Sequence, residues 1–302
     1  MIYDLIIIGN GPAGLSAGLY GARSNLKTLI IGAQLGGTML DAFLIENYPG
    51  IEEISGTELA QKLKKQVEKL NGEIIEDAVE KIQKKSDSFE IFTNSNKKYQ
   101  SKALILALGT QHRKLNVPGE EKLMGRGVSY CATCDSPFFK DKTVAVVGGG
   151  DSAVKAAMLA AQHSKKVYIL VRGEKLTCEP LNEKNCKKNP KIEIIYKVNV
   201  KEIKGETKVE SVLLDNNKEL KVGGMFVEIG LAPVSALANE LKLELDERKF
   251  IKVDSSQRTN IPLVYAAGDI SNAMGGFKQI LTAAAQGAIA ATSAFRDLKH
   301  PK

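Results

Sequence analysis

Two copies of one local pattern limit the fold of this chain more than any other feature of its sequence. In each copy a short apolar run, Leu5 to Ile8 or Val144 to Val147, ends in a glycine-rich turn and is followed by an alanine-rich stretch. A strand that passes through such a turn into a helix begins a βαβ unit. After the second copy, Val167 to Val171 follows as the next apolar run. The pattern predicts an α/β protein with two Rossmann-like dinucleotide-binding domains.

The chain is longer than one typical domain, with 302 residues of which 43% are hydrophobic. Pro118 and Pro233 each interrupt the chain after a strand-like run. We therefore expect a first domain made of residues 1–113 and 237–302, with residues 114–236 inserted as the second. Near the C-terminus, "QILTAAAQGAIAATSAF" is too rich in alanine and glycine for an exposed helix. We expect this helix to pack closely against another element or a cofactor.

The first glycine-rich turn has the spacing Gly9-x-Gly11-x-x-Gly14. In the dinucleotide fingerprint the first glycine permits the tight turn, the second lets a pyrophosphate approach, and the third lets the helix pack closely on the strand. The helix N-terminus adds N–H donors and a partial positive charge. The acidic residue that usually binds the ribose is missing, because "TLIIGAQLGG" offers Gly32 and Gln34 at that place. Ribose binding must therefore differ here.

The second turn reads Gly148-x-Gly150-x-x-Ala153 and predicts another nucleotide-type fold. After the following strand the sequence offers Arg172, where a ribose 2′-phosphate would need a cluster of cationic groups. The sequence therefore supports the fold of the second domain better than it supports nucleotide binding.

Cys131 and Cys134 lie three residues apart in "CATCD", with Asp135 directly after them. At the start of a helix such a pair has a lowered thiol pKa and suits disulfide exchange, with the adjacent carboxyl as proton donor or acceptor. The alternative is half of a zinc site completed by Cys178 and Cys186, but their spacing is not that of a zinc ribbon. We favour the redox interpretation. In their lysine-rich stretch, we expect Cys178 and Cys186 to be partly exposed, and we favour an incidental pair over the alternative of a secondary disulfide.

The composition argues against a membrane protein and against a nucleic-acid-binding protein. No run of eighteen uncharged apolar residues occurs, and "MIYDLIIIGNGP" lacks the features of a signal peptide, so we expect a cytoplasmic protein. The net charge of +7 suits an acidic protein partner. The lysines are mixed with acidic residues and lack the aromatic platforms that single-stranded nucleic acid needs. We expect neither a membrane nor a nucleic acid partner.

Together, the glycine motifs with "ENYPG", "CATCD", "GGGDSA" and "AAGD" resemble those of the low-molecular-weight thioredoxin reductases, in the same order along nearly the whole chain. The resemblance implies an FAD domain made of both ends of the chain, an inserted nicotinamide-type domain carrying the cysteines, and a homodimer. It also implies a thioredoxin-disulfide reductase that passes electrons from a donor through FAD to the Cys131–Cys134 disulfide and on to thioredoxin or a glutaredoxin-like protein. In the family the inserted domain rotates about short linkers, which we would place near Pro118 and Pro233.

The resemblance also assigns roles to single residues. Cys131 would attack the disulfide of the partner, Cys134 would face the flavin, and Asp135 would be the acid. The residues expected to bind FAD are Gly9, Gly11, Pro12, Ala13, Gly14, Gly37, Asn47, Val79, Gly109, Gly268, Asp269, Lys278, Gln279 and Ile280. Of these, Asn47 and Gln279 would lie near the flavin, and Asp269 would bind the ribityl chain. The residues of the second nucleotide site would be Gly148, Gly150, Asp151, Ser152, Ala153 and Arg172.

This sequence departs from the family at the expected NADPH site. Relatives that use NADPH carry a histidine and several arginines after the second strand of the inserted domain, where this chain has Arg172, Gly173 and Thr177. The acidic pair in the preceding helix is replaced by Val154 and Lys155. One guanidinium cannot replace a clamp of several charge-assisted bonds, each worth roughly 1.5–3 kcal/mol. This argues against NADPH and leaves NADH, reduced ferredoxin or a reduced deazaflavin as donor.

Two further alternatives remain from the sequence. Besides a thioredoxin-disulfide reductase, the chain could be a reductase for another disulfide protein or a redox-sensing flavoprotein without efficient electron input. Thr38, where relatives often have glutamine, also changes one expected flavin contact.

Overall fold

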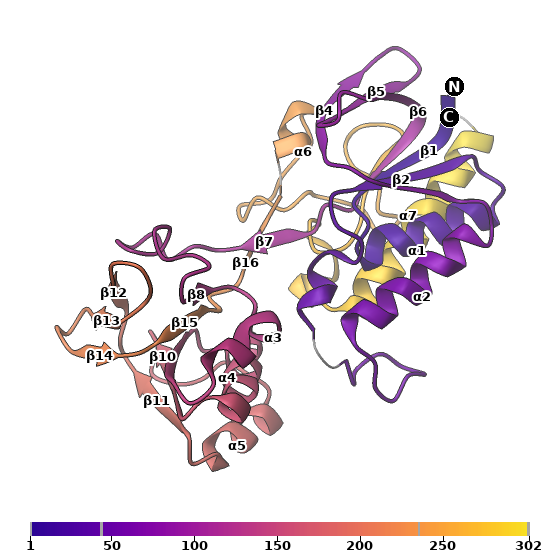
Figure 1. Cartoon of the computed structure of the whole chain (residues 1–302). Helices are drawn as coiled ribbons and strands as arrows, with labels where there is room; N and C mark the ends of the chain where they lie inside the picture. Colours follow the sequence, from indigo (N-terminus) through magenta and orange to yellow (C-terminus); the bar gives the residue numbers. More distant parts are fainter. Residues whose placement is uncertain (1, 43–44, 235, 301–302) are drawn as a thin grey trace. The chain divides into compact units, whose positions relative to one another are not determined.

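The computed structural model describes residues 2–42, 45–234 and 236–300. The chain divides into two compact units: unit 1 consists of residues 1–111 and 233–302, and unit 2 consists of residues 112–232. The predicted α/β class with two Rossmann-like folds, the second inserted into the first, is confirmed (Figure 1). Within the described ranges, no helix is long and apolar enough to cross a membrane.

Unit 1 is built on a mostly parallel sheet with the strand order β3-β2-β1-β6-β5-β4, in which β17 also pairs with β6. Its strands are β1 (Ile2–Ile8), β2 (Thr28–Gly32), β3 (Glu73–Glu76), β4 (Val79–Lys84), β5 (Phe89–Thr93), β6 (Lys98–Leu106) and β17 (Val264–Ala266). β4 and β5 are antiparallel to their neighbours. The inner parallel strands are buried on both faces, which explains why β1 and β2 are almost continuous apolar runs.

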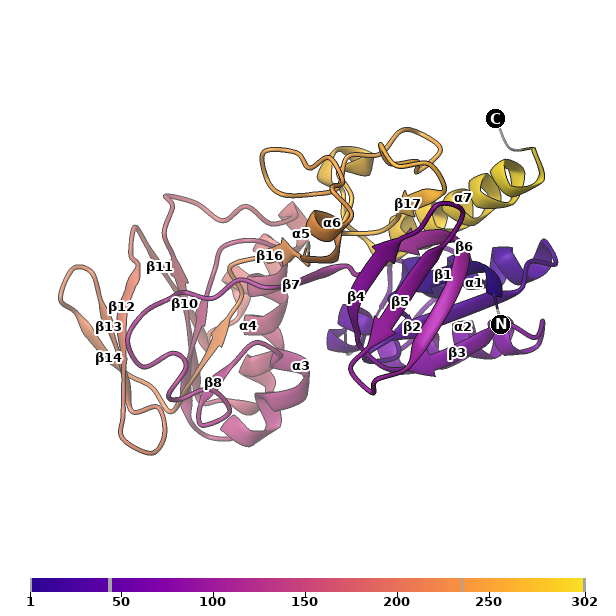
Figure 2. The ribbon, with the colours of Figure 1, turned by 90° about the horizontal axis from the view of Figure 1, so that it is seen from above.

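Two apolar layers cover this sheet. Leu5 and Ile7 of β1 face a core shared with the helices at residues 12–23, 56–68 and 280–299, whereas Ile6 and Ile8 face a core that includes apolar residues of the segment 237–251. Helices α1, α2 and α7 lie together on one face in Figures 1 and 2. The helices of unit 1 are α1 (Pro12–Arg23), α2 (Gly56–Glu68), α6 (Ala236–Glu240) and α7 (Ile280–Lys299), with the 3-10 turns η1 (Gly37–Asp41) and η3 (Ala273–Gly276).

The alanine-rich helix predicted near the C-terminus is α7, and it packs against α1. A Cβ atom added to Gly287 would lie 2.0 Å from the carbonyl oxygen of Ala13, so the two helices touch through their backbones. A larger residue at 287 would separate them. The close approach places Ile280 and Ala283 of α7 beside the glycine-rich turn that precedes α1.

The C-terminal end of α7 is held by Asp297. Its two carboxylate oxygens accept hydrogen bonds from Nε and Nη2 of Arg258, both at 2.8 Å. The hydroxyl of Tyr265 on β17 donates to Asp297 Oδ2 at 2.6 Å, and Tyr265 is 1% exposed. Burial and the adjacent carboxylate raise the pKa of Tyr265, which therefore stays a donor.

We expect Asp297→Ala to lower the free energy of unfolding by about 1–3 kcal/mol, because it leaves the buried Tyr265 hydroxyl without this acceptor. Urea denaturation checks this result. Glu68→Gln is a suitable control in the same unit, because it removes a solvent-exposed ion pair with Lys64 on α2. An equal loss in both variants would show that the Asp297 contacts contribute no more than a surface pair.

Unit 2 contains a fully parallel sheet with the order β11-β10-β9-β15-β8 and a separate antiparallel sheet, β12-β13-β14. The strands are β8 (Val128–Ser129), β9 (Thr143–Val147), β10 (Lys166–Val171), β11 (Ile192–Tyr196), β12 (Val200–Lys204), β13 (Ser211–Leu214), β14 (Glu219–Lys221) and β15 (Gly224–Val227). The helices are α3 (Ala132–Asp135), η2 (Ser136–Phe139), α4 (Asp151–His163) and α5 (Pro180–Lys188). Figure 2 shows α4 and α5 beside the parallel sheet.

The chain passes between the units at residues 111–112 and 232–233. The strands at these positions, β7 (Thr110–His112) and β16 (Leu231–Pro233), pair with each other. Pro233 is therefore the residue at which the chain returns from unit 2 to unit 1. Pro118 lies inside unit 2, where its carbonyl oxygen accepts a hydrogen bond from Ile203 N at 2.9 Å.

Candidate functional site

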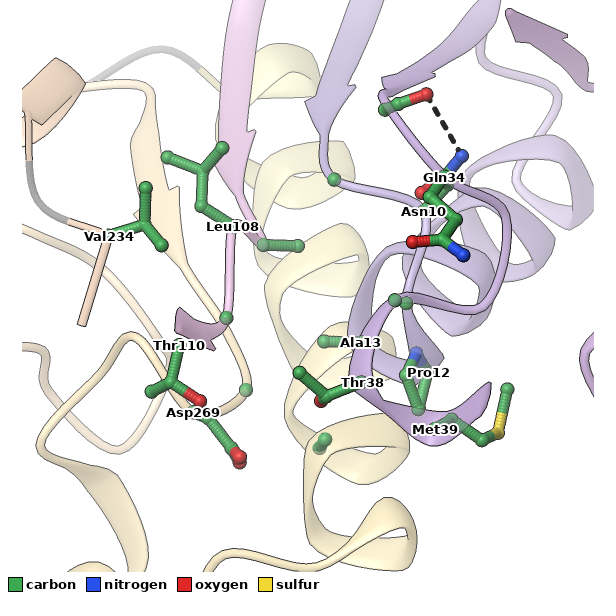
Figure 3. Close-up of a pocket in the computed structure, with 18 of the residues that line it drawn as sticks. Asn10, Pro12, Ala13, Gln34, Thr38, Met39, Leu108, Thr110, Val234 and Asp269 are labelled. Atoms are coloured by element: carbon green, nitrogen blue, oxygen red, sulfur yellow. Dashed lines mark hydrogen bonds between the residues drawn. The ribbon is translucent and has the colours of Figure 1, made fainter. Parts of the chain in front are cut away.

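Unit 1 contains a cavity of about 590 Å³ at the carboxyl ends of its parallel strands. The residues that follow β1, β2, β3, β6 and β17 all contribute to its wall, together with the start of α7 (Figure 3). Ligands of open α/β sheets bind at this edge, and the volume lies within the range of small-molecule and cofactor sites.

The first glycine motif forms one side of the cavity. Gly9 has φ +113°, and a Cβ atom there would lie 2.1 Å from the carbonyl oxygen of Ala107, so glycine is required. A Cβ atom on Gly14 would lie 1.8 Å from the Gly9 oxygen, so Gly14 brings α1 onto β1. The backbone of Gly11 faces open space, with Gly36 O at 3.7 Å from an added Cβ atom. This is the cradle that a phosphate group needs.

The N-terminus of α1 points its donors at this cradle. Gly11 is the N-cap residue, and within the described part of the chain no side chain caps the helix or places an acid in its first turn. The free N–H groups and the helix dipole there favour an anion. The site therefore fits the pyrophosphate of a dinucleotide.

Asn10 follows β1, and its side chain reaches the end of β2, where the ribose-binding acid of other dinucleotide folds is expected. Asn10 is 3% exposed, its side-chain Nδ2 donates to the Gly32 carbonyl at 3.1 Å, and both Asn10 and Gln34 line the cavity (Figure 3). Amide groups thus stand in the place of the missing carboxylate. Sequence reasoning named Gln34 only as a residue found where the acid is missing, and it missed Asn10, although Asn10 lies inside the glycine motif.

Three polar groups face the other side of the cavity. The Thr110 hydroxyl is buried without a hydrogen-bond partner among the residues that the structure describes, which points to a ligand as its partner. Burial raises the pKa of Asp269 and lowers that of Lys278. Lys278 Nζ donates to the backbone oxygen of Asp269 and lies 3.5 Å from the ring centroid of Phe250. Sequence reasoning also missed Thr110, because nothing in the sequence around it signals a ligand.

Of the residues predicted to bind the cofactor, twelve line this cavity: Gly9, Gly11, Pro12, Ala13, Gly37, Val79, Gly109, Gly268, Asp269, Lys278, Gln279 and Ile280. Gly14 and Asn47 do not. Asn47 contacts a lining residue instead, since its Nδ2 donates to Gln279 Oε1 at 3.0 Å. Thr38, where relatives often have glutamine, lines the cavity as well.

The cysteine pair of unit 2 forms a disulfide. Cys131 and Cys134 are bonded, with their Cα atoms 5.3 Å apart, and the Cys131 sulfur accepts a hydrogen bond from Cys134 N at 3.1 Å. Cys131 is the N-cap residue of α3, so its sulfur lies where a helix favours negative charge. Cys134 is exposed and Cys131 is partly exposed, which leaves the bond open to exchange. Asp135 lies at the end of α3 and is partly exposed.

The predicted partial exposure of Cys178 and Cys186 is wrong for Cys186. Both cysteines are free thiols, but Cys186 is 0% exposed and belongs to the core between α4 and the sheet. Helix α5 turns its lysines toward solvent and Cys186 inward, and burial raises the pKa of both thiols. Their sulfurs are therefore poor nucleophiles.

The second glycine motif has the predicted strand–turn–helix form at β9 and α4. A Cβ atom on Gly148 would lie 2.2 Å from Glu228 O, whereas one on Gly150 would have Thr177 Oγ1 as its nearest neighbour, at 3.9 Å. Ala153 is fully buried under the turn.

Acidic side chains surround the N-terminus of α4. The Ser152 hydroxyl donates to Glu228 Oε2, and Asp151 Oδ1 accepts from Glu179 N at 2.9 Å and from Asn182 Nδ2 at 2.7 Å. Arg172 is exposed. Gly150 is the N-cap residue of α4, and among the described residues no side-chain hydrogen bond caps this helix, so its N-terminal N–H groups remain open to an anion, as those of α1 do. The turn therefore keeps the form of a dinucleotide site, but Arg172 is the only arginine in residues 172–177, where a ribose 2′-phosphate would need several cationic groups.

Comparison with known proteins gives a consistent result. The family model described as pyridine nucleotide-disulphide oxidoreductase matches residues 3–287. A protein named thioredoxin reductase from Peptoclostridium litorale is 40% identical over 306 residues, covering 97% of this chain and 96% of that protein. The crystal structure of Lactococcus lactis thioredoxin reductase superposes with a TM-score of 0.94 at 39% identity, covering 98% of this chain and 99% of the other. A ferredoxin-flavin thioredoxin reductase from Clostridium acetobutylicum is 33% identical, with a TM-score of 0.53 and coverage of 99% and 98%.

Proposed function

Because the chain belongs to the thioredoxin reductases, FAD-dependent enzymes of the pyridine nucleotide-disulphide oxidoreductase family, we propose that it reduces a thioredoxin-like protein through Cys131 and Cys134. The observation that carries the proposal is the disulfide itself, closed in an exposed turn at the start of a helix. The residues around the unit 1 cavity would hold FAD, with Gly9, Gly11 and the α1 N-terminus at its pyrophosphate. Bound there, FAD would supply a two-electron carrier between the donor and the disulfide.

The reduced pair would act by thiol–disulfide exchange. The Cys131 thiolate attacks one sulfur of the partner's disulfide, a mixed disulfide forms, and the other partner sulfur leaves as a thiolate. Cys134 then attacks the Cys131 sulfur, which closes the Cys131–Cys134 bond again and releases the partner as a dithiol. We assign Asp135 the transfer of the Cys134 thiol proton to the partner sulfur that leaves when the mixed disulfide forms. The partner sulfur that leaves when Cys134 attacks takes its proton from solvent.

The surface of unit 2 supports a protein partner. Residues 112–232 contain 21 Lys and Arg against 15 Asp and Glu, whereas the rest of the chain contains 21 against 20. Unit 2 therefore carries a net charge of +6 and unit 1 a net charge of +1. Phe138, four residues after Cys134, is 73% exposed. An acidic thioredoxin-like protein with an apolar rim around its own disulfide suits this combination of charge and exposed ring.

We further propose that the electron donor is not NADPH. The support is the sequence after β10, where Arg172 is exposed and is the only arginine in residues 172–177, although a 2′-phosphate needs several charge-assisted bonds. A reduced ferredoxin is the donor we favour, because the basic unit 2 attracts acidic proteins and one relative is named for ferredoxin. NADH and a reduced deazaflavin are the other donors to test.

Anaerobic stopped-flow absorbance tests this proposal. The flavin-loaded protein is mixed in parallel with NADPH, NADH, reduced ferredoxin and reduced deazaflavin, and bleaching of the flavin band is followed before oxidised thioredoxin is added. We expect fast bleaching by ferredoxin, followed by recovery of the band on addition of thioredoxin. Fast bleaching by NADPH would contradict the assignment of the donor, and bleaching without recovery would contradict the assignment of the partner.

The family also suggests a cytoplasmic homodimer, which we propose here. Unit 1 offers exposed apolar side chains on two adjacent helices, Tyr20 of α1 and Leu281 and Ile289 of α7, exposed by 43%, 40% and 42%. A second copy covering these side chains would remove them from water.

A further inference from the structure

The turn that carries the disulfide is weakly held by its own backbone. Strand β8, just before the cysteines, pairs with β15 at two positions, Val128 with Met225 and Ser129 with Phe226. Helix α3, which follows, has four residues. Such short elements contribute few ladder or helix hydrogen bonds, so side chains must fix the two ends of the turn.

The C-terminal end of the turn is fixed by an aromatic contact. Phe139 is 6% exposed and lies edge-on to Phe226 of β15, with ring centroids 5.3 Å apart. Gly224 makes room for this ring, because a Cβ atom there would lie 2.0 Å from it. Phe139 thus anchors η2 in the core of unit 2.

The N-terminal end of the turn is fixed by a buried carboxylate. The hydroxyl of Tyr130, the residue before Cys131, donates to Glu120 Oε1 at 2.6 Å, and Glu120 is 1% exposed. Burial and the adjacent Glu120 raise the pKa of Tyr130, so its hydroxyl keeps its proton at neutral pH. A buried hydrogen bond between a phenol and a carboxylate is both strong and directional.

The same carboxylate holds the segment through which the chain enters unit 2. Glu120 Oε1 accepts a hydrogen bond from Leu115 N at 2.8 Å, and Oε2 accepts one from Asn116 N at 2.6 Å. The ring of His112, the first residue of unit 2, lies 5.7 Å from the ring of Tyr130. Glu120 therefore joins the entry segment and the redox turn in one network.

We propose that Glu120 and Tyr130 are positioning residues that fix the Cys131 end of the redox turn to the entry segment of unit 2. Electron exchange between FAD and the disulfide needs the turn in one defined place. The Ser129 hydroxyl bonds the Cys131 backbone within the turn, whereas Tyr130 links the N-terminal end of the turn to the entry segment through Glu120. The inference rests on the proposed function, because a positioned turn matters only if the disulfide exchanges electrons.

The test uses Tyr130→Phe in the flavin-loaded protein, because this change keeps the ring and removes the bonded hydroxyl. Amide hydrogen exchange of the peptide covering residues 128–136 is expected to be about 10-fold faster in the variant, as expected when a turn loses its anchor. Tyr196→Phe is the matched control, because Tyr196 is a partly buried tyrosine of the same unit that lies on β11, at the opposite edge of the parallel sheet from β8, and packs on a different core from Tyr130. This variant should leave amide exchange and flavin bleaching unchanged.

The second measurement follows flavin bleaching with excess dithiothreitol under anaerobic conditions. The reagent reduces the Cys131–Cys134 bond and is itself oxidised to its cyclic disulfide. FAD held in unit 1 would accept the two electrons that Cys131 and Cys134 release when their bond closes again. We expect bleaching to slow about 10-fold in Tyr130→Phe, since misplacing reacting groups by about 1 Å can reduce a rate 100-fold. The final extent of bleaching should not change, because position affects the rate and not the equilibrium.

Several outcomes would overturn the proposal. Exchange and bleaching rates equal to those of Tyr196→Phe would show that the hydroxyl positions nothing, and a changed extent of bleaching would show an effect on potential instead. The Glu120→Gln side chain cannot accept hydrogen bonds from Leu115 N, Asn116 N and the Tyr130 hydroxyl together. It should therefore change amide exchange and flavin bleaching more than Tyr130→Phe does, and smaller changes would also contradict the proposal. If the wild-type flavin does not bleach at all, the proposed electron route fails, whereas hydrogen exchange still decides the role of Tyr130.

Discussion

Cys131→Ser is expected to lower the rate of thioredoxin reduction by more than about 10³-fold, because the variant loses the sulfur that forms the mixed disulfide. A serine hydroxyl at neutral pH is not ionised and cannot exchange with a disulfide. FAD binding should be unaffected, because the residues expected to bind the cofactor lie in unit 1 and Cys131 lies in unit 2. The flavin absorbance of the purified variant and steady-state reduction of thioredoxin measure these two effects separately.

Cys178→Ser is the matched control for this prediction. Cys178 is a partly buried free thiol in the same unit, and its pKa is raised by burial. We expect the control to retain the activity of the parent. Residual activity of Cys131→Ser above a few per cent would mean that another sulfur reaches the partner and would contradict the assigned role.

Gly11→Ala is expected to weaken FAD binding about 100-fold or more while leaving the fold of unit 1 intact. The backbone at Gly11 has φ −76°, and an added Cβ atom would meet Gly36 O at 3.7 Å, an ordinary contact. The protein without flavin therefore tolerates alanine, but the methyl group fills the space through which a pyrophosphate approaches the α1 N-terminus. Loss of one or two charge-assisted bonds of roughly 1.5–3 kcal/mol each corresponds to this change in affinity.

Gly150→Ala provides the comparison, because Gly150 has the same place in the second glycine motif and an added Cβ atom there would also meet no close neighbour. We expect this variant to keep both its flavin and its rate of flavin reduction by the physiological donor. Titration of the flavin-free proteins with FAD, followed by flavin fluorescence, gives the dissociation constants. Equal affinity in Gly11→Ala and the parent would place the pyrophosphate elsewhere, and slower flavin reduction in Gly150→Ala would point to a dinucleotide donor in unit 2.

The sequence predicted those parts of the fold and site that depend on local backbone requirements. Gly9 and Gly148 both have positive φ values, and each requirement is visible as a glycine after an apolar run. The Cys131–Cys134 pair was equally predictable, because residues three apart at a helix start are close in any fold that contains the helix. These features do not depend on how distant segments meet.

The parts that the sequence did not predict depend on tertiary contacts. Thr110 faces the cavity because β6 and β17 end side by side, and Glu228 reaches Ser152 because β15 pairs with β9. No pattern in the local sequence shows which strands will end next to each other in the sheet. The burial of Cys186 was missed for a related reason. The lysines around Cys186 lie on the exposed face of α5, whereas Cys186 lies on the face that packs on α4.

The division of unit 1 between both ends of the chain affects the order of events during synthesis. Unit 2 is one continuous segment and has all of its residues once residue 232 has been made, whereas the wall of the cavity lacks Val234, Ala267–Asp269 and Lys278–Ile280 until the last seventy residues emerge. The contact between Gly287 and Ala13 links residues 274 positions apart, and contacts of such long range form late. A nascent chain therefore completes unit 2 before it completes the cavity of unit 1, so a cofactor that needs the whole cavity wall can bind only after the inserted unit has been synthesised.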